Sequence, residues 1–206
     1  MKKKHPHKKI REIIEYAQQK GWIIKESIVR KIEMNYYNFS LIFDFDTEID
    51  IEMYLDPLYE AGCGDAIVGM GQRGSIVLDF MRESESAYQA VYSAIQQVKS
   101  VIPTAILIQV SPDLVGVLEL SEILECSKQN IQKYTNKDTF PNPFFKSHQA
   151  IWHLDEVLEW FWIKNEKKVD FKLLEIAKLS RNINLTLETK KANDQILKQA
   201  QELVAI

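Results

Sequence analysis

The chain has 206 residues, of which 46% are apolar and 27% charged, a composition typical of a globular protein that can bury a sizeable core. Its formal net charge of −3 argues against a protein that coats nucleic acid without regard to sequence. The apolar runs fall short of the ~20 residues that span a bilayer, and the lysine-rich start lacks the apolar core of a signal peptide, so we expect a cytoplasmic protein with no membrane partner.

The charge is unevenly distributed along the chain. Residues 1–11 carry five lysines and one arginine and no acid. Apolar residues then recur at helical spacing over residues 8–20, and Gly21 is a natural stop. We therefore expect residues 1–35 to be a basic N-terminal helix segment with a structural or docking role.

The next segment begins with a strand and a helix. Apolar residues alternate with others from Phe39 to Phe45, which predicts a half-buried strand. A helical pattern follows as far as residue 61, interrupted by Pro57. Either this helix is kinked at the proline, or Asp56 caps a short helix that begins at Pro57.

Two further strands, a second helix and a last strand follow. Glycines between Gly62 and Gly74 surround AIVGM and precede SIVLDFM, a composition that predicts a hairpin. The strand TAILIQVS closes the series. The order strand, helix, strand, strand, helix, strand indicates an α+β, ferredoxin-like βαββαβ module over residues 36–111. The second helix is expected to bury Tyr88, Val91, Ile95, Val98 and Ile102.

Several motifs in this module have a structural interpretation that is stronger than the functional one. GMGQRG at residues 69–74 fits G-x-G-x-x-G, but these glycines open a strand and not the helix that receives a pyrophosphate. Cys63 has no histidine near it in sequence to activate its thiol. The acids at alternate positions between Asp44 and Glu52 lack the spacing of a calcium loop. We expect no catalytic residue, no metal and no cofactor, and hence not an enzyme.

The strings LELSEILE and SKQNIQKYT predict two short helices joined by a tight turn. Leu120, Ile123 and Leu124 face inward on the first helix, and Cys126 fills the turn. The second helix is anchored through Ile131 and Tyr134, with its start capped by the hydroxyl of the preceding serine.

The second helix exposes a polar face, and a wing follows it. Amide side chains pair with adenine edges, and lysines bind guanine or phosphate, which is the chemistry of major-groove readout. Residues 144–152 are expected to form a hairpin, and a final helix to follow it. Trp152 and Trp160 are expected to pack in the core of the domain. The candidate DNA-binding residues are Ser127, Lys128, Gln129, Asn130, Gln132, Lys133, Lys146 and His148.

The run LELSEILECSKQNIQKYTNKDTFPNPFFKSHQAIWHLDEVLEWF resembles the winged helix-turn-helix of MerR-type and AlpA/excisionase-type DNA-binding proteins. The span 37–160 is similar to a family of small prokaryotic helix-turn-helix proteins, some of them encoded beside small toxin-like genes. The resemblance implies a winged helix-turn-helix DNA-binding domain over residues 112–164. Glu125 departs from the family, because it stands at the turn position where glycine is usual.

A charged spacer and a long helical pattern end the chain. An isolated amphipathic tail cannot bury its own apolar stripe, so residues 165–206 are expected to pack on the body or on a second subunit, and we favour a C-terminal helical dimerisation tail. The sequence thus predicts a dimeric transcriptional regulator, a repressor, that binds specific double-stranded DNA. The resemblance adds an antitoxin-like form that also holds a small toxin-like protein. The rival interpretation is a small-ligand-binding or assembly module in which the helix pair is only scaffold.

Overall fold

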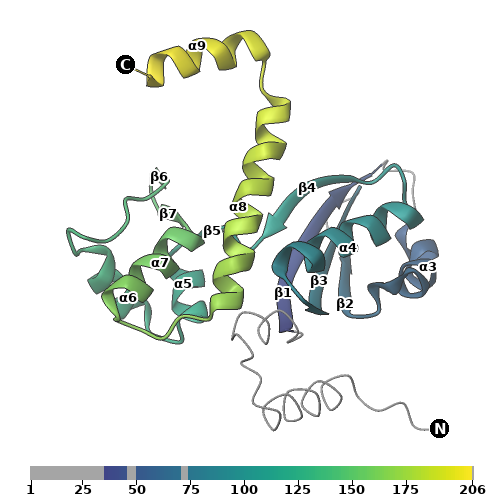
Figure 1. Ribbon diagram of the computed structural model, residues 1–206, viewed down its shortest axis with the longest axis horizontal. Coiled ribbons are helices and arrows are strands. Elements are labelled where there is room, and N and C mark those ends of the chain that lie inside the picture. Colours follow the sequence, from purple (N-terminus) through teal and green to yellow (C-terminus); the bar gives the residue numbers. More distant parts are fainter. Residues whose placement is uncertain (1–34, 46–49, 71–73, 206) are drawn as a thin grey trace, which may run out of the picture.

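The computed structural model describes residues 35–45, 50–70 and 74–205. The predicted basic N-terminal helix lies outside the described residues. The chain is α+β, with antiparallel sheets and two separate hydrophobic cores. Figure 1 shows the two bodies on either side of one long helix, α8 (Phe171–Lys191).

The first body is a four-stranded sheet with the order β2-β3-β1-β4, in which neighbouring strands are antiparallel. The alternation predicted for the first strand is confirmed, since Tyr37, Phe39, Leu41 and Phe43 are all buried. The order of strands and helices also agrees with the predicted one. The strands are β1 (Asn35–Asp44), β2 (Ala66–Met70), β3 (Ser75–Ser84) and β4 (Ile106–Ser111).

Three short helical elements connect β1 to β2. They are η1 (Ile51–Tyr54), α3 (Leu55–Leu58) and η2 (Tyr59–Cys63). The carboxylate of Asp50 caps the first of them by accepting from the backbone N–H of Glu52 at 3.1 Å. The alternative in which Asp56 caps a helix beginning at Pro57 is therefore wrong: the proline lies inside α3, where a 3-10 turn precedes it and a wider turn follows it.

Helix α4 (Ala87–Val101) covers one face of the sheet. Its buried stripe differs from the predicted one at Tyr88, which is 58% exposed and stacks on Tyr92 with 5.7 Å between ring centroids. The reason is that the core-facing stripe is built on small residues, which let the helix approach the sheet closely. The buried residues are Ala87, Ala90, Val91, Ala94 and Val98.

The buried Arg82 fastens the β2–β3 hairpin to α4. Its guanidinium donates to both carboxylate oxygens of Asp65 at 2.8 Å and to the hydroxyl of Ser93 at 2.9 Å. It also donates to the carbonyl of Gly62 at 3.0 Å, where φ is +104°. Burial raises the pKa of the adjacent Cys63 thiol despite the nearby Arg82 charge, so this cysteine is poorly suited to be a nucleophile.

The second body contains three helices and a small sheet with the order β5-β7-β6. Its core includes Trp152 and Trp160, as predicted, together with Phe140 and Phe161 at ring-centroid distances from 5.0 to 6.3 Å. The elements are β5 (Leu114–Val115), α5 (Val117–Ile123), α6 (Lys128–Thr135), β6 (Phe145–Lys146), β7 (Ala150–His153) and α7 (Leu154–Lys164).

Helix α8 belongs to both cores. Ile176 is buried in the core of the first body, whereas Leu174 and Ala177 are buried in that of the second. The hydroxyl of Tyr37 donates to the carboxylate of Glu175 at 2.9 Å. Burial, and to a smaller extent this hydrogen bond, raises the pKa of Tyr37 to about 12. Most of the predicted tail is thus the support that joins the bodies, whereas α9 (Asp194–Val204) at its end has no buried residue. Within the described part of the chain, no helix is both long and apolar enough to cross a bilayer.

Candidate nucleic-acid interface

Helices α5 and α6 are joined by a three-residue turn whose centre is a left-handed residue. Helix α5 begins where the carboxylate of Glu119 accepts from the backbone N–H of Gly116 at 3.0 Å. It ends at the turn of Leu124, Glu125 and Cys126, with φ at Glu125 of +48°. Ser127 then caps α6, as predicted, by accepting from the N–H of Asn130 at 3.3 Å.

Replacing Glu125 with glycine is expected to raise the free energy of unfolding by about 0.5–1 kcal/mol. A non-glycine residue in this conformation costs about 1–2 kcal/mol, and the extra entropy of glycine in the unfolded chain offsets up to about 1 kcal/mol of that gain. The matched control is Asn165→Gly at φ +52°, which should gain less because asparagine enters this region more readily. Chemical denaturation measures both; a loss of stability in the Glu125 variant contradicts the strained-turn account.

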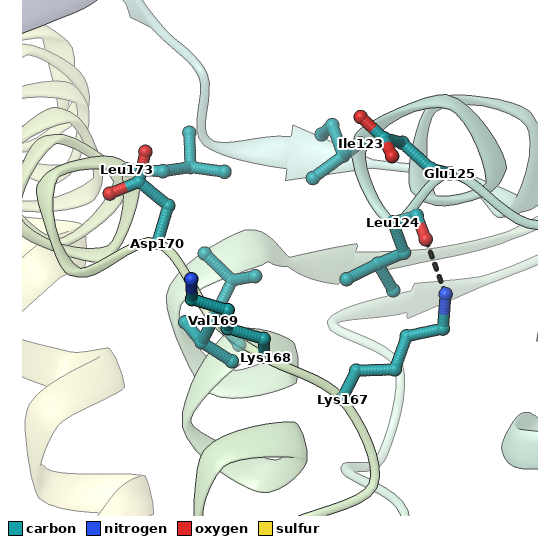
Figure 2. A pocket seen from close by; sticks show the side chains of 9 residues that line it. Ile123, Leu124, Glu125, Lys167, Lys168, Val169, Asp170 and Leu173 are labelled. Atoms are coloured by element: carbon teal, nitrogen blue, oxygen red, sulfur yellow. Dashed lines mark hydrogen bonds between the residues drawn. The ribbon is translucent and has the colours of Figure 1, made fainter.

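A lysine from the segment between α7 and α8 supports the same turn. The ammonium group of Lys167 donates to the main-chain carbonyl of Leu124, at the carboxyl end of α5 (Figure 2). Beside this contact lies a cavity of about 380 Å³, with Ile123 and Glu125 on one wall and residues 167–170 and Leu173 on the other. The segment between α7 and α8 is therefore attached to the turn that precedes α6.

The outward face of α6 carries the predicted residues. Ile131 is 1% exposed and anchors the helix. The ring of Tyr134 packs edge-on against that of Phe161, with 4.9 Å between the ring centroids. At ~100° per residue, Gln129 and Lys133 lie roughly opposite the buried Ile131. All eight candidate residues are exposed. Among the described residues, the side chains of Lys128, Gln129, Gln132, Lys133 and Lys146 have no hydrogen-bond or ion-pair partner.

The charges of the helix pair are segregated along the chain. Acids lie on α5 and at its end, namely Glu119, Glu122 and Glu125, whereas lysines occupy α6 and the hairpin. Lys137 just beyond α6 serves the structure: it pairs with Glu166 at 2.5 Å and lies 5.0 Å from the centroid of Tyr134. Residues 116–153 carry four lysines and four acids, and this formal net charge of zero conceals a cationic face on α6.

Strands β6 and β7 form the expected hairpin, with Phe145 opposite Ile151. Lys146 and His148 lie at its exposed tip, where the hydroxyl of Ser147 contacts Nδ1 of His148 at 3.5 Å. In Figure 1 the hairpin and α6 are set apart within the second body. The structure therefore does not bring Lys146 and His148 into one cluster with the α6 residues; they form a second exposed group.

A buried polar network that the sequence reasoning missed holds the hairpin to α8. The Nδ1–H of His153 donates to the Asp113 carboxylate at 2.7 Å, and both side chains are buried. The other carboxylate oxygen of Asp113 accepts from Asn184 at 2.8 Å. Asn184 also exchanges two hydrogen bonds with the main chain of Val110, at 2.9 and 2.8 Å. No local signal points to this network, because its members lie 40 and 71 residues apart in sequence.

Comparisons with known proteins add no assignment: no family model matches the chain, and no curated protein and no solved structure is similar enough to match. Within the described residues, no group of three histidine, cysteine, aspartate or glutamate side chains is placed to hold a metal ion. The candidate interface is therefore inferred from the arrangement of its own residues alone.

Proposed function

We propose that this chain is a sequence-specific, dimeric regulator of transcription that binds double-stranded DNA through α6. In this proposal residues 112–164 act as a winged helix-turn-helix, with α6 in the major groove and the β6–β7 hairpin against the phosphate backbone. Residues 36–111 act as a ferredoxin-like module that α8 holds rigidly against it.

The observation that carries the proposal is the outward face of α6. Two amides and two lysines, Gln129, Gln132, Lys128 and Lys133, are exposed on a capped helix and have no hydrogen-bond or ion-pair partner among the described residues. Side chains that stabilise a fold normally have partners within it, as Lys137 does. Amide and ammonium groups on a rigid helix are the groups that read base edges.

The test starts with the DNA. Sequencing of the fragments that the purified full chain retains at near-physiological salt identifies the preferred site, and salt dependence of the affinity then counts the phosphate contacts. Retention of no fragment, or equal retention of all fragments, contradicts sequence-specific binding.

The double variant Gln129→Ala/Lys133→Ala is expected to lose about 100-fold in affinity for that site, since each base contact contributes roughly 1–3 kcal/mol. The control Gln96→Ala/Lys99→Ala removes the same residue types from the exposed face of α4 in the other body and should bind normally. Gel-shift titration compares them. Equal affinities for both variants would remove α6 from the interface.

A second candidate function involves the face of the four-stranded sheet opposite α4. Ile67 is 76%, Met81 61% and Tyr36 56% exposed there, beside the exposed carboxylate of Asp79. An apolar surface with acids suits a small basic protein. In the antitoxin-like form of the proposal this face holds such a partner, encoded next to the regulator, and co-purification of the two gene products tests it.

A further inference from the structure

Helix α9 presents an apolar face that nothing in the described chain covers. Ile196 is 61%, Leu203 72% and Val204 87% exposed, and none of the residues of α9 is buried. Figure 1 shows α9 standing away from both bodies at the far end of α8. An isolated helix of 11 residues is only marginally stable in water. A partner surface is therefore needed to stabilise this helix.

The sequence of α9 is symmetric about Ala200. Ile196 and Val204 stand equally far before and after it, as do Leu197 and Leu203. At ~100° per residue, all five apolar side chains fall within a stripe of roughly 120° centred on Ala200. A stripe of this kind looks the same when it is read from either end.

We infer that α9 pairs with α9 of a second copy of this chain, antiparallel and about a two-fold axis at Ala200. In that register Ile196 packs against the partner's Val204, and Leu197 against the partner's Leu203. Ala200 meets its own counterpart at the axis, where its small side chain lets the two helices approach closely. Self-complementarity of this type is what an isologous interface requires.

The polar residues of α9 also suit an identical partner. Gln199 and Gln201 flank the apolar stripe, and an amide both donates and accepts, so two identical edges can hydrogen-bond to one another. The charged residues Asp194, Lys198 and Glu202 lie on the opposite side, where two copies do not repel. That side carries one lysine against two acids, unlike helices that bind anionic membranes.

This inference deepens the dimeric part of the proposed function and is tested without DNA. The stripe is only about 12 Å long, so we expect a weak dimer in analytical ultracentrifugation over about 1–300 µM of full chain. Leu203→Gln should raise the dimer dissociation constant about tenfold or more, whereas Lys198→Gln on the opposite side should leave it unchanged. Neither change touches a buried residue, so the fold provides no alternative explanation.

Cysteine cross-linking tests the direction of pairing. A mixture of Ile196→Cys and Val204→Cys chains should form a disulfide-linked heterodimer under mild oxidation, and each variant alone should form far less. A monomer at every concentration, an unchanged dimer in Leu203→Gln, preferential cross-linking of Ile196→Cys to itself, or binding of α9 to anionic vesicles in place of self-association overturns the inference. DNA binding by a monomer would refute the dimer and leave the α6 proposal intact.

Discussion

Replacing Asp113 with alanine is expected to lower the free energy of unfolding by about 3–5 kcal/mol, the cost of breaking a buried pair of polar groups by removing one partner. The carboxylate accepts hydrogen bonds from His153 at 2.7 Å and Asn184 at 2.8 Å, and the side chains of Asp113 and His153 are both buried. Without it, the buried imidazole of His153 loses this partner, and the Asn184 amide keeps only its two hydrogen bonds to the main chain of Val110. Thermal and urea denaturation measure the loss.

The matched control for this substitution is Asp138→Ala. Asp138 lies in the same body but is exposed, and a surface substitution of this kind normally changes stability by less than about 0.5 kcal/mol. A second variant, Asp113→Asn, keeps the shape but cannot accept in the same way from both neighbours, so it should fall between the two. A stable Asp113→Ala chain means that the network does not hold the hairpin to α8.

The network also explains why the two bodies act as one support. Asp113 follows β4 of the first body, His153 ends β7 of the second, and Asn184 lies on α8. The main-chain carbonyl of Asp113 accepts from Leu154 at the start of α7. Hydrogen bonds from one residue, Asp113, thus connect the end of the first body's sheet to β7, to the start of α7 and to α8.

How much of this structure the sequence predicts depends on the range of the interactions involved. The alternation in β1 and the serine cap of α6 are local patterns, and the structure agrees with both. The prediction that Tyr88 is buried is wrong, because helical spacing cannot distinguish a tyrosine at the edge of a buried stripe from one within it, and here alanines decide how closely the helix packs.

For a related reason, the sequence leaves open whether α8 packs on the body or on a second subunit, and the structure shows that it packs on the body. Its apolar residues are interrupted by charged ones, so the sequence resembles an exposed dimerisation helix. In the structure some apolar residues of α8 pack in the core of the first body and others in the core of the second, so the apolar stripe is divided between the two cores. Among the charged residues, Arg181 pairs with Asp155 and Glu156 of α7, and these contacts outweigh its desolvation and raise its pKa. Contacts of this range carry no local signature. The exposed residues of α6, by contrast, follow from one buried position, Ile131, and the helical repeat.

The variant Ile131→Ala is expected to destabilise the protein by about 2–5 kcal/mol, because it removes three carbon atoms from a packed core and leaves a cavity under α6. Ile131 is 1% exposed, and it is the buried residue through which α6 joins the core that contains Leu120 and Phe161. The control is Ile163→Ala in α7 of the same body: the same change at a side chain that is 71% exposed, in a helix where alanine is the better helix former. Its stability should be unchanged or slightly higher. Comparable losses in the two variants would mean that α6 is not anchored through Ile131.

If only Ile131→Ala is destabilised, its affinity for the DNA site should also fall at temperatures where the rest of the chain is still folded, because a loosened α6 no longer holds Gln129 and Lys133 in a fixed position.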